Sequence, residues 1–112
     1  MRFRILILAL ILVTGTLGVS AAAKKAKSRT RTHTVTMTGL HYDPPTLTMK
    51  SGDTVVWVNK DLVAHTATSK IGGFDSSIIQ PDKSWKTVIT RKGEVPYGCT
   101  FHPAMKATLR VQ

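Results

Sequence analysis

The sequence contains very little cysteine, because Cys99 is the only one among 112 residues. A single cysteine excludes an intrachain disulfide, although exported domains of this size often depend on disulfides. A lone thiol in an oxidising compartment is buried and inert, paired with another chain, or occupied by a metal. The residues around Cys99 must decide among these three states.

The sequence also lacks a convincing amphipathic helix. From residue 32 onward, short runs rich in Val, Ile and Thr are separated by Gly, Pro, Asp and Asn. This pattern predicts a single all-β domain over residues 32–112, built as a Greek-key β-sandwich of about seven or eight strands in two antiparallel sheets. The predicted strands cover 32–38, 46–50, 54–59, 65–69, 84–90, 95–99 and 107–111, with turns at 39–45 and an irregular excursion with at most a short strand at 71–81.

Long hydrophobic runs are scarce as well. The longest, residues 5–19, follows the basic start at 1–4 and precedes the small residues at 20–23. A run of about 15 residues is shorter than the roughly 20 that a membrane-spanning helix needs. We therefore interpret residues 1–23 as a secretory signal peptide cleaved near Ala23 or Ala21, with a retained membrane anchor as the alternative. The expected location is periplasmic or secreted.

Acidic residues are few, with six Asp and Glu against sixteen Lys and Arg. Removal of residues 1–23 takes away Arg2 and Arg4, so fourteen basic residues remain against six acids, a net charge of +8. Residues 24–31 show no apolar periodicity and predict a basic, flexible arm. The simplest interpretation of this arm is a solvated tail. The alternative is an arm that binds an acidic protein or an anionic membrane surface. Export argues against nucleic acid as the partner.

The chemistry-bearing motif is Tyr-Gly-Cys-Thr-Phe-His-Pro-Ala-Met at 97–105, between the last two predicted strands. It places the side chains of Cys99, His102 and Met105 at intervals of three. A thiolate and two imidazoles, with a thioether weakly bound on the axis, form a type 1 copper site. The alternatives are a merely buried Cys99 and a Met105 that only fills the core. The motif therefore predicts a copper loop that needs one more imidazole.

His65 is the best candidate for the second imidazole, because it follows a turn at the start of a predicted strand. His33 lies within the first strand and His41 in a loop, which makes both weaker candidates. The sequence thus predicts one copper ion held by His65, Cys99, His102 and Met105.

Residues 35–111 resemble the plastocyanin and amicyanin group of cupredoxins. The spacing of two residues on either side of His102 is similar to that of the amicyanin loop, whereas the plastocyanin methionine lies further on. Thr66 is a departure, since many members carry Asn after the first histidine ligand. The other features that carry the resemblance are Tyr42-Asp43-Pro44, Gly52 to Asn59, His65, Gly73 to Ser76 and Tyr97.

The resemblance implies a monomeric, non-enzymatic protein that shuttles single electrons between redox partners by Cu(II)/Cu(I) cycling. Partner proteins would dock transiently near the exposed edge of His102, and lysines such as Lys60, Lys70 and Lys106 would steer acidic partners towards it. The main alternative is a periplasmic copper-trafficking or storage protein that binds Cu(I) through the same ligands. A copper enzyme and a copper-free adhesion module are further alternatives. The expected apolar ring around His102 consists of Leu62, Val63, Phe101, Pro103 and Ala104.

Overall fold

The computed structural model describes residues 15, 18 and 29–112. The predicted signal peptide, apart from residues 15 and 18, and residues 24–28 of the predicted arm lie outside the described residues. Residues 29–31 are exposed and precede the first strand. Within the described part of the chain, no helix is long and apolar enough to cross a membrane.

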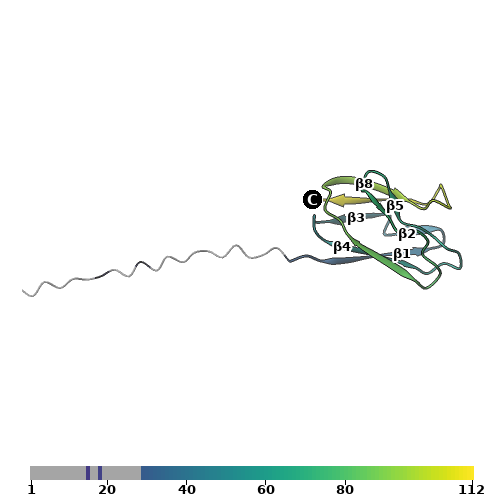
Figure 1. Ribbon diagram of the computed structural model, residues 1–112, viewed down its shortest axis with the longest axis horizontal. Helices are drawn as coiled ribbons and strands as arrows, with labels where there is room; N and C mark the ends of the chain where they lie inside the picture. Colours follow the sequence, from purple (N-terminus) through teal and green to yellow (C-terminus); the bar gives the residue numbers. More distant parts are fainter. Residues whose placement is uncertain (1–14, 16–17, 19–28) are drawn as a thin grey trace, which may run out of the picture.

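In the described residues, nine strands form two facing sheets (Figure 1), which confirms the predicted all-β sandwich. The first sheet has the order β2-β1-β4-β7 and the second the order β3-β9-β8-β5-β6. The strands are β1 (Thr32–Thr38), β2 (His41–Asp43), β3 (Thr46–Met49), β4 (Thr54–Asn59), β5 (Thr68–Ser69), β6 (Phe74–Asp75), β7 (Ser84–Val88), β8 (Gly93–Gly98) and β9 (Lys106–Val111).

Both sheets are mixed, so the prediction of two antiparallel sheets was wrong for one pair of strands in each sheet. Strand β1 pairs in parallel with β4, and β3 pairs in parallel with β9. The chain passes from the first sheet to the second between β2 and β3, across Pro44 and Pro45. The partners in each parallel pair are therefore not consecutive strands of the chain. A short hairpin, which would make two neighbouring strands antiparallel, does not join them.

Two local predictions also need correction. The predicted turn at 39–45 contains β2, which pairs with β1 across a two-residue turn at Gly39 and Leu40, both with positive φ. The predicted strand at 65–69 is shorter than expected, because only Thr68 and Ser69 form β5. His65 instead makes an isolated bridge to Ile79.

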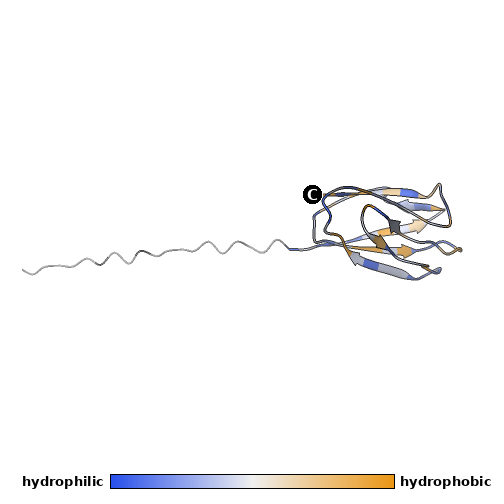
Figure 2. Ribbon diagram, turned by 45° about the horizontal axis from the view of Figure 1, so that its top comes forward, coloured by the Kyte–Doolittle hydropathy of each residue, from blue (hydrophilic) through white to orange (hydrophobic). Residues whose placement is uncertain are grey.

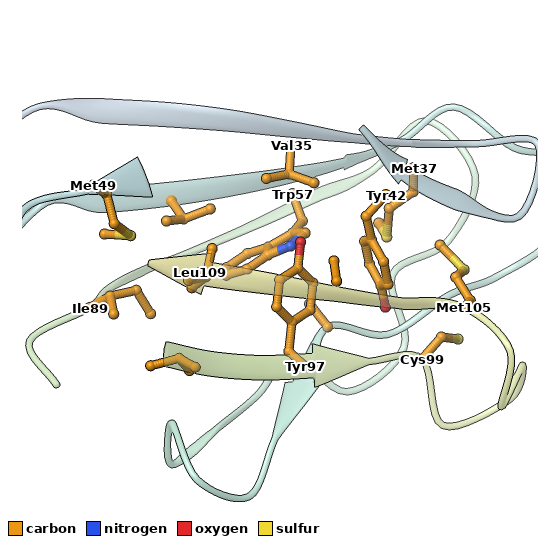
Figure 3. Packing of buried hydrophobic residues seen from close by; sticks show 14 of the residues in the cluster. Val35, Met37, Tyr42, Met49, Trp57, Ile89, Tyr97, Cys99, Met105 and Leu109 are labelled. Carbon is orange, nitrogen blue, oxygen red and sulfur yellow. The ribbon is translucent and has the colours of Figure 1, made fainter. Parts of the chain in front are cut away.

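Alternation along the strands builds the core between the sheets, and Figure 2 shows hydrophobic and hydrophilic residues changing along the ribbons. Trp57 at the centre of β4 is fully buried. Its ring lies 5.7 Å from that of Trp85 and 5.4 Å from that of Tyr97. Figure 3 shows this aromatic packing continuing along β8 to Cys99. The packed core thus extends to one end of the sandwich, where the predicted ligands lie.

Candidate metal centre

Three of the predicted ligands meet at one end of the sandwich. Ligand atoms of His65, Cys99 and His102 all lie within 4.8 Å of one another. The Cys99 Sγ is 3.8 Å from His65 Nδ1 and 3.5 Å from His102 Nδ1. His65 and Cys99 are buried, whereas His102 is half-buried. The site therefore has an enclosed side and one imidazole that reaches towards the surface.

Met105 is the last residue of the ligand loop, and its backbone bonds close the loop. It directly precedes β9 and is 2 % exposed. Its N–H donates to the His102 carbonyl at 2.9 Å, and its own carbonyl accepts from the Cys99 N–H at 3.1 Å. Figure 3 shows Met105 and Cys99 at the same end of the core. These bonds fold the segment from Cys99 to Met105 back on itself.

Gly98 allows this closure because it carries no Cβ. A Cβ at this position would lie 3.0 Å from the Met105 carbonyl oxygen, closer than ordinary van der Waals contact. That carbonyl is the acceptor for the Cys99 N–H. A larger residue at position 98 would therefore push against the bond that closes the loop.

The orientation of His65 is fixed by Asp61. The Asp61 carboxylate lies 2.6 Å from His65 Nε2 and also accepts the N–H groups of Gly39 and Leu40. Burial alone would raise the pKa of Asp61, but these three hydrogen bonds hold the pKa below its usual value. A carboxylate at Nε2 assigns the ring proton to that nitrogen and leaves Nδ1, which faces Cys99, as the ligand atom.

Thr66 joins the two segments that carry the ligands. Its N–H lies 3.4 Å from the Cys99 Sγ, and its hydroxyl accepts the N–H of Thr100 at 3.0 Å. Tyr42 in turn donates its buried hydroxyl to the Thr66 carbonyl at 2.6 Å. The threonine thus makes the connection between ligand segments for which the resemblance led us to expect an asparagine.

The donor set fits copper. Two imidazole nitrogens and a thiol converge, and the methionine thioether belongs to the same loop. Soft sulfur donors select Cu(I), and imidazoles also suit Cu(II). The cluster formed by His65, Cys99, His102 and Met105 is therefore typical of a type 1 copper site.

The two weaker histidine candidates lie outside this cluster. His33 pairs with Asp53 through a 2.9 Å contact. His41 is exposed and lies on the rim of a shallow hollow beside His102. The preference for His65 agrees with the geometry.

The surface around His102 is hollow and apolar. A cavity of about 470 Å³ is lined by Phe101, His102, Pro103 and Ala104, together with Leu40 from the β1–β2 turn. Phe101 is 51 % exposed, and Leu62 in the neighbouring turn is 97 % exposed. Three members of the predicted apolar ring, Phe101, Pro103 and Ala104, line the hollow, and Leu40 lines it as well, although the sequence did not suggest it. Leu62 and Val63 are exposed but do not line it.

The sequence matches the family described as cupredoxin-like domain over residues 6–111. The chain belongs to the cupredoxin family. This cupredoxin is 30 % identical over 78 residues to amicyanin of Paracoccus versutus, in a match that covers 65 % of the chain and 59 % of the relative. It is 35 % identical over 77 residues to plastocyanin of Synechococcus sp., with 56 % of each covered. The chain thus spans less than two thirds of the length of these relatives.

Solved structures of amicyanin share the fold of this cupredoxin. A reduced amicyanin variant is similar with a TM-score of 0.67 and 26 % identity, covering 72 % of this chain and 82 % of that one. The Cu(I) form of another amicyanin variant is similar with a TM-score of 0.67 and 25 % identity, and the match covers 78 % of this chain and 88 % of the amicyanin chain. The predicted resemblance to the amicyanin and plastocyanin group is confirmed.

Sequence reasoning missed the residues that support the ligands. Asp61 lies four residues before His65, and an acid this close to a predicted ligand histidine could have indicated the carboxylate that orients it. Thr100 gave no signal, because its partner is 34 residues away in the sequence. Asn59 was also missed, although its side chain donates to the carbonyls of Val63 and Ile79 and shapes the turn before His65.

Proposed function

We propose that this cupredoxin is an exported electron carrier that holds one copper ion through His65, Cys99, His102 and Met105. The convergence of the His65, Cys99 and His102 donor atoms, with Met105 buried on the same loop, carries the proposal. Blue-copper electron-transfer sites combine two imidazoles, a thiolate and a weak axial thioether. The similarity to amicyanin and plastocyanin supports the same assignment, because the resemblance to that group implies a non-enzymatic electron carrier.

Copper supplies one-electron chemistry when bound, as it alternates between Cu(II) and Cu(I). The residues of the chain hold the ligands in place for this exchange. Asp61 orients His65, Thr66 ties the first ligand segment to the loop, and the Met105 carbonyl closes the loop on Cys99. A ligand set fixed in this way limits the change of geometry that accompanies each electron.

The half-buried ring of His102 is the proposed site of electron exchange. It opens into the hollow lined by Phe101, Pro103 and Ala104. An exposed apolar patch of this kind fits brief docking of a partner protein. Four protein donors leave no evident position for a substrate, which supports a carrier rather than an enzyme. We further propose that the protein is a monomer.

Steering of acidic partners by lysines is a weaker part of the proposal. Lys60 lies 3.7 Å from Asp82, which reduces its effect on an approaching charge. Lys70 and Lys106 line a cavity of about 370 Å³ beside Cys99 and have no acidic partner among the described residues. Export to the periplasm or outside the cell rests on the sequence of residues 1–23.

The absorption spectrum of the chain after addition of Cu(II), with the Cys99→Ser variant alongside, tests this function. An intense visible band that is absent from the variant is the expected result, because it reports a Cu(II)–thiolate bond. Tight Cu(I) binding without such a band would favour copper trafficking or storage. No copper binding in either oxidation state would contradict both functions and leave only the fold.

A further inference from the structure

The end of the sandwich opposite the ligand loop gathers basic side chains. Here residues 29–31, the turn 50–54 and the segment 89–93 meet the last residue, Gln112. The N–H groups of Ser51, Gly52 and Thr54 donate to the carbonyls of Gln112, Ile89 and Arg31 at 2.8–2.9 Å. In Figure 1, the chain enters and ends on the side away from the β8–β9 loop. We call this the basic end and define it by five exposed residues, Arg29, Arg31, Lys50, Arg91 and Lys92.

The basic end carries most of the net charge of the described domain. Residues 29–112 contain eleven Lys and Arg and six Asp and Glu, a net charge of +5. The five residues of the basic end and one acid, Asp53, give +4, so the remaining six basic and five acidic residues give +1. Glu94 and Arg110 nearby form an ion pair at 3.1 Å and cancel. The charge is thus concentrated at the end far from the copper ligands.

Asp53, the one acid of the basic end, is buried and bonds to other groups of the protein. Asp53 is 2 % exposed and accepts the backbone N–H groups of Arg31 and Lys50 as well as bonding to His33. These bonds lower the pKa of Asp53 to about 2, led by the Arg31 N–H, so it is ionised at neutral pH. The carboxylate therefore holds the backbone of two basic residues in place while their side chains remain exposed.

Exposed apolar residues are distributed in the opposite way. Among the large exposed apolar residues that the structure describes, Val88 on the edge strand β7 lies near the basic end, since it pairs with Thr54. The rest, Leu40, Leu62, Val63, Ile71, Ile78 and Phe101, lie in turns and loops away from it. A protein–protein interface usually has an apolar or aromatic centre, which the basic end lacks. Clustered Lys and Arg without such a centre fit a surface of anionic lipid headgroups.

We propose that the basic end associates with an anionic membrane surface and leaves the ligand loop facing away from it. Residue 29, where the continuously described part of the chain begins, belongs to this end, and the sequence directly before it contains three further lysines at positions 24, 25 and 27. In this orientation the apolar hollow at His102 stays open to soluble redox partners. The association does not depend on copper, so it goes beyond the proposed electron-carrier function.

Vesicle binding of the full chain tests this surface. The measured quantity is the ratio of affinities for vesicles of phosphatidylglycerol with phosphatidylcholine and for pure phosphatidylcholine, which separates charge from any contribution of the apolar run at 5–19. Each basic residue near an anionic surface contributes roughly fivefold in affinity. We expect the double variant Arg91→Gln/Lys92→Gln to lower the ratio about 25-fold.

The matched control is Lys60→Gln/Lys83→Gln, which removes the same charge from two exposed positions at the opposite end of the sandwich, where the Asn59 N–H donates to the Lys83 carbonyl. We expect it to change the ratio less than about threefold, because charges beyond a Debye length are largely screened. Equal losses in the two double variants would overturn the proposal, since they would show a response to net charge alone. A wild-type ratio near one would also overturn it and turn attention to an acidic protein. The visible copper band of each variant shows separately whether the metal site is intact.

Discussion

The two ends of the sandwich contain the same structural device and use it differently. At each end, an aspartate accepts two backbone N–H groups and bonds to a histidine Nε2, with Asp61 and His65 at 2.6 Å and Asp53 and His33 at 2.9 Å. At the ligand end, the second ring nitrogen of His65 faces the Cys99 thiol. At the basic end, the structure shows no such thiol partner for His33. In this chain, the carboxylate–histidine pair belongs to a candidate metal site at the end where a thiol and a second imidazole face the histidine.

The largest expected effect distinguishes the two histidines. His65→Gln removes a proposed ligand from the buried side of the site, so we expect the visible Cu(II) band to disappear. His33→Gln should leave the band at its wild-type intensity, because His33 contacts Asp53 and lies outside the cluster. A Cu(II) titration followed by absorption measures both. A band that survives in His65→Gln would show that another residue supplies the second imidazole.

The two aspartates give the next largest contrast. Asp61→Asn weakens the contact that orients His65, and loss of such a supporting carboxylate typically costs 10- to 100-fold in metal affinity. We expect a loss of about this size in Cu(I) affinity, measured by competition with a chromophoric chelator. Asp53→Asn is the matched control and should leave the affinity unchanged. Equal affinities for the two variants would show that Asp61 has only a structural role.

Acid stability should respond to the aspartate at the other end. The pKa of Asp53 falls from 3.8 to about 2 on folding, so its ionised form adds stability above pH 3.8 that is lost as the pH falls through about 2. We therefore expect Asp53→Asn to lower the thermal midpoint at pH 7 and the difference from wild type to shrink as the pH approaches 2. Thermal unfolding between pH 2 and 7, with the exposed Asp43→Asn as control, measures this effect. A difference that is constant with pH would contradict it.

The smallest expected effect concerns the tie between the ligand segments. Thr66→Val keeps the shape of a buried side chain but removes the acceptor for the Thr100 N–H. We expect the free energy of unfolding of the metal-free chain to fall by about 0.5–1.5 kcal/mol, the net contribution of one hydrogen bond, because Thr100 is exposed and water can bond to its N–H. Thr34→Val on the exposed face of β1 should change it by less than about 0.5 kcal/mol. Denaturant unfolding measures the stability of both variants. Equal losses in the two would show that the hydrogen bond between Thr66 and Thr100 does not stabilise the connection between the ligand segments.

The sequence predicted most of the fold, and the structure brings together three of the four predicted ligands, His65, Cys99 and His102. Alternation in runs such as 54–59 indicated strands, and the spacing of Cys99, His102 and Met105 indicated the site because these ligands are close in the sequence. Strand partners were less predictable, since the parallel pairing of β1 with β4 depends on where the chain changes sheets. The contacts of Thr66 with Thr100 depend on the same long-range arrangement.

A spectroelectrochemical titration of the copper-loaded chain tests the central claim most directly. An electron carrier holds its metal in both oxidation states, so the visible band should bleach with one electron per protein and return fully on reoxidation. The bleached sample should keep its copper through gel filtration. Loss of copper on reduction, or a band that does not return, would contradict the account and indicate a protein that delivers or stores Cu(I).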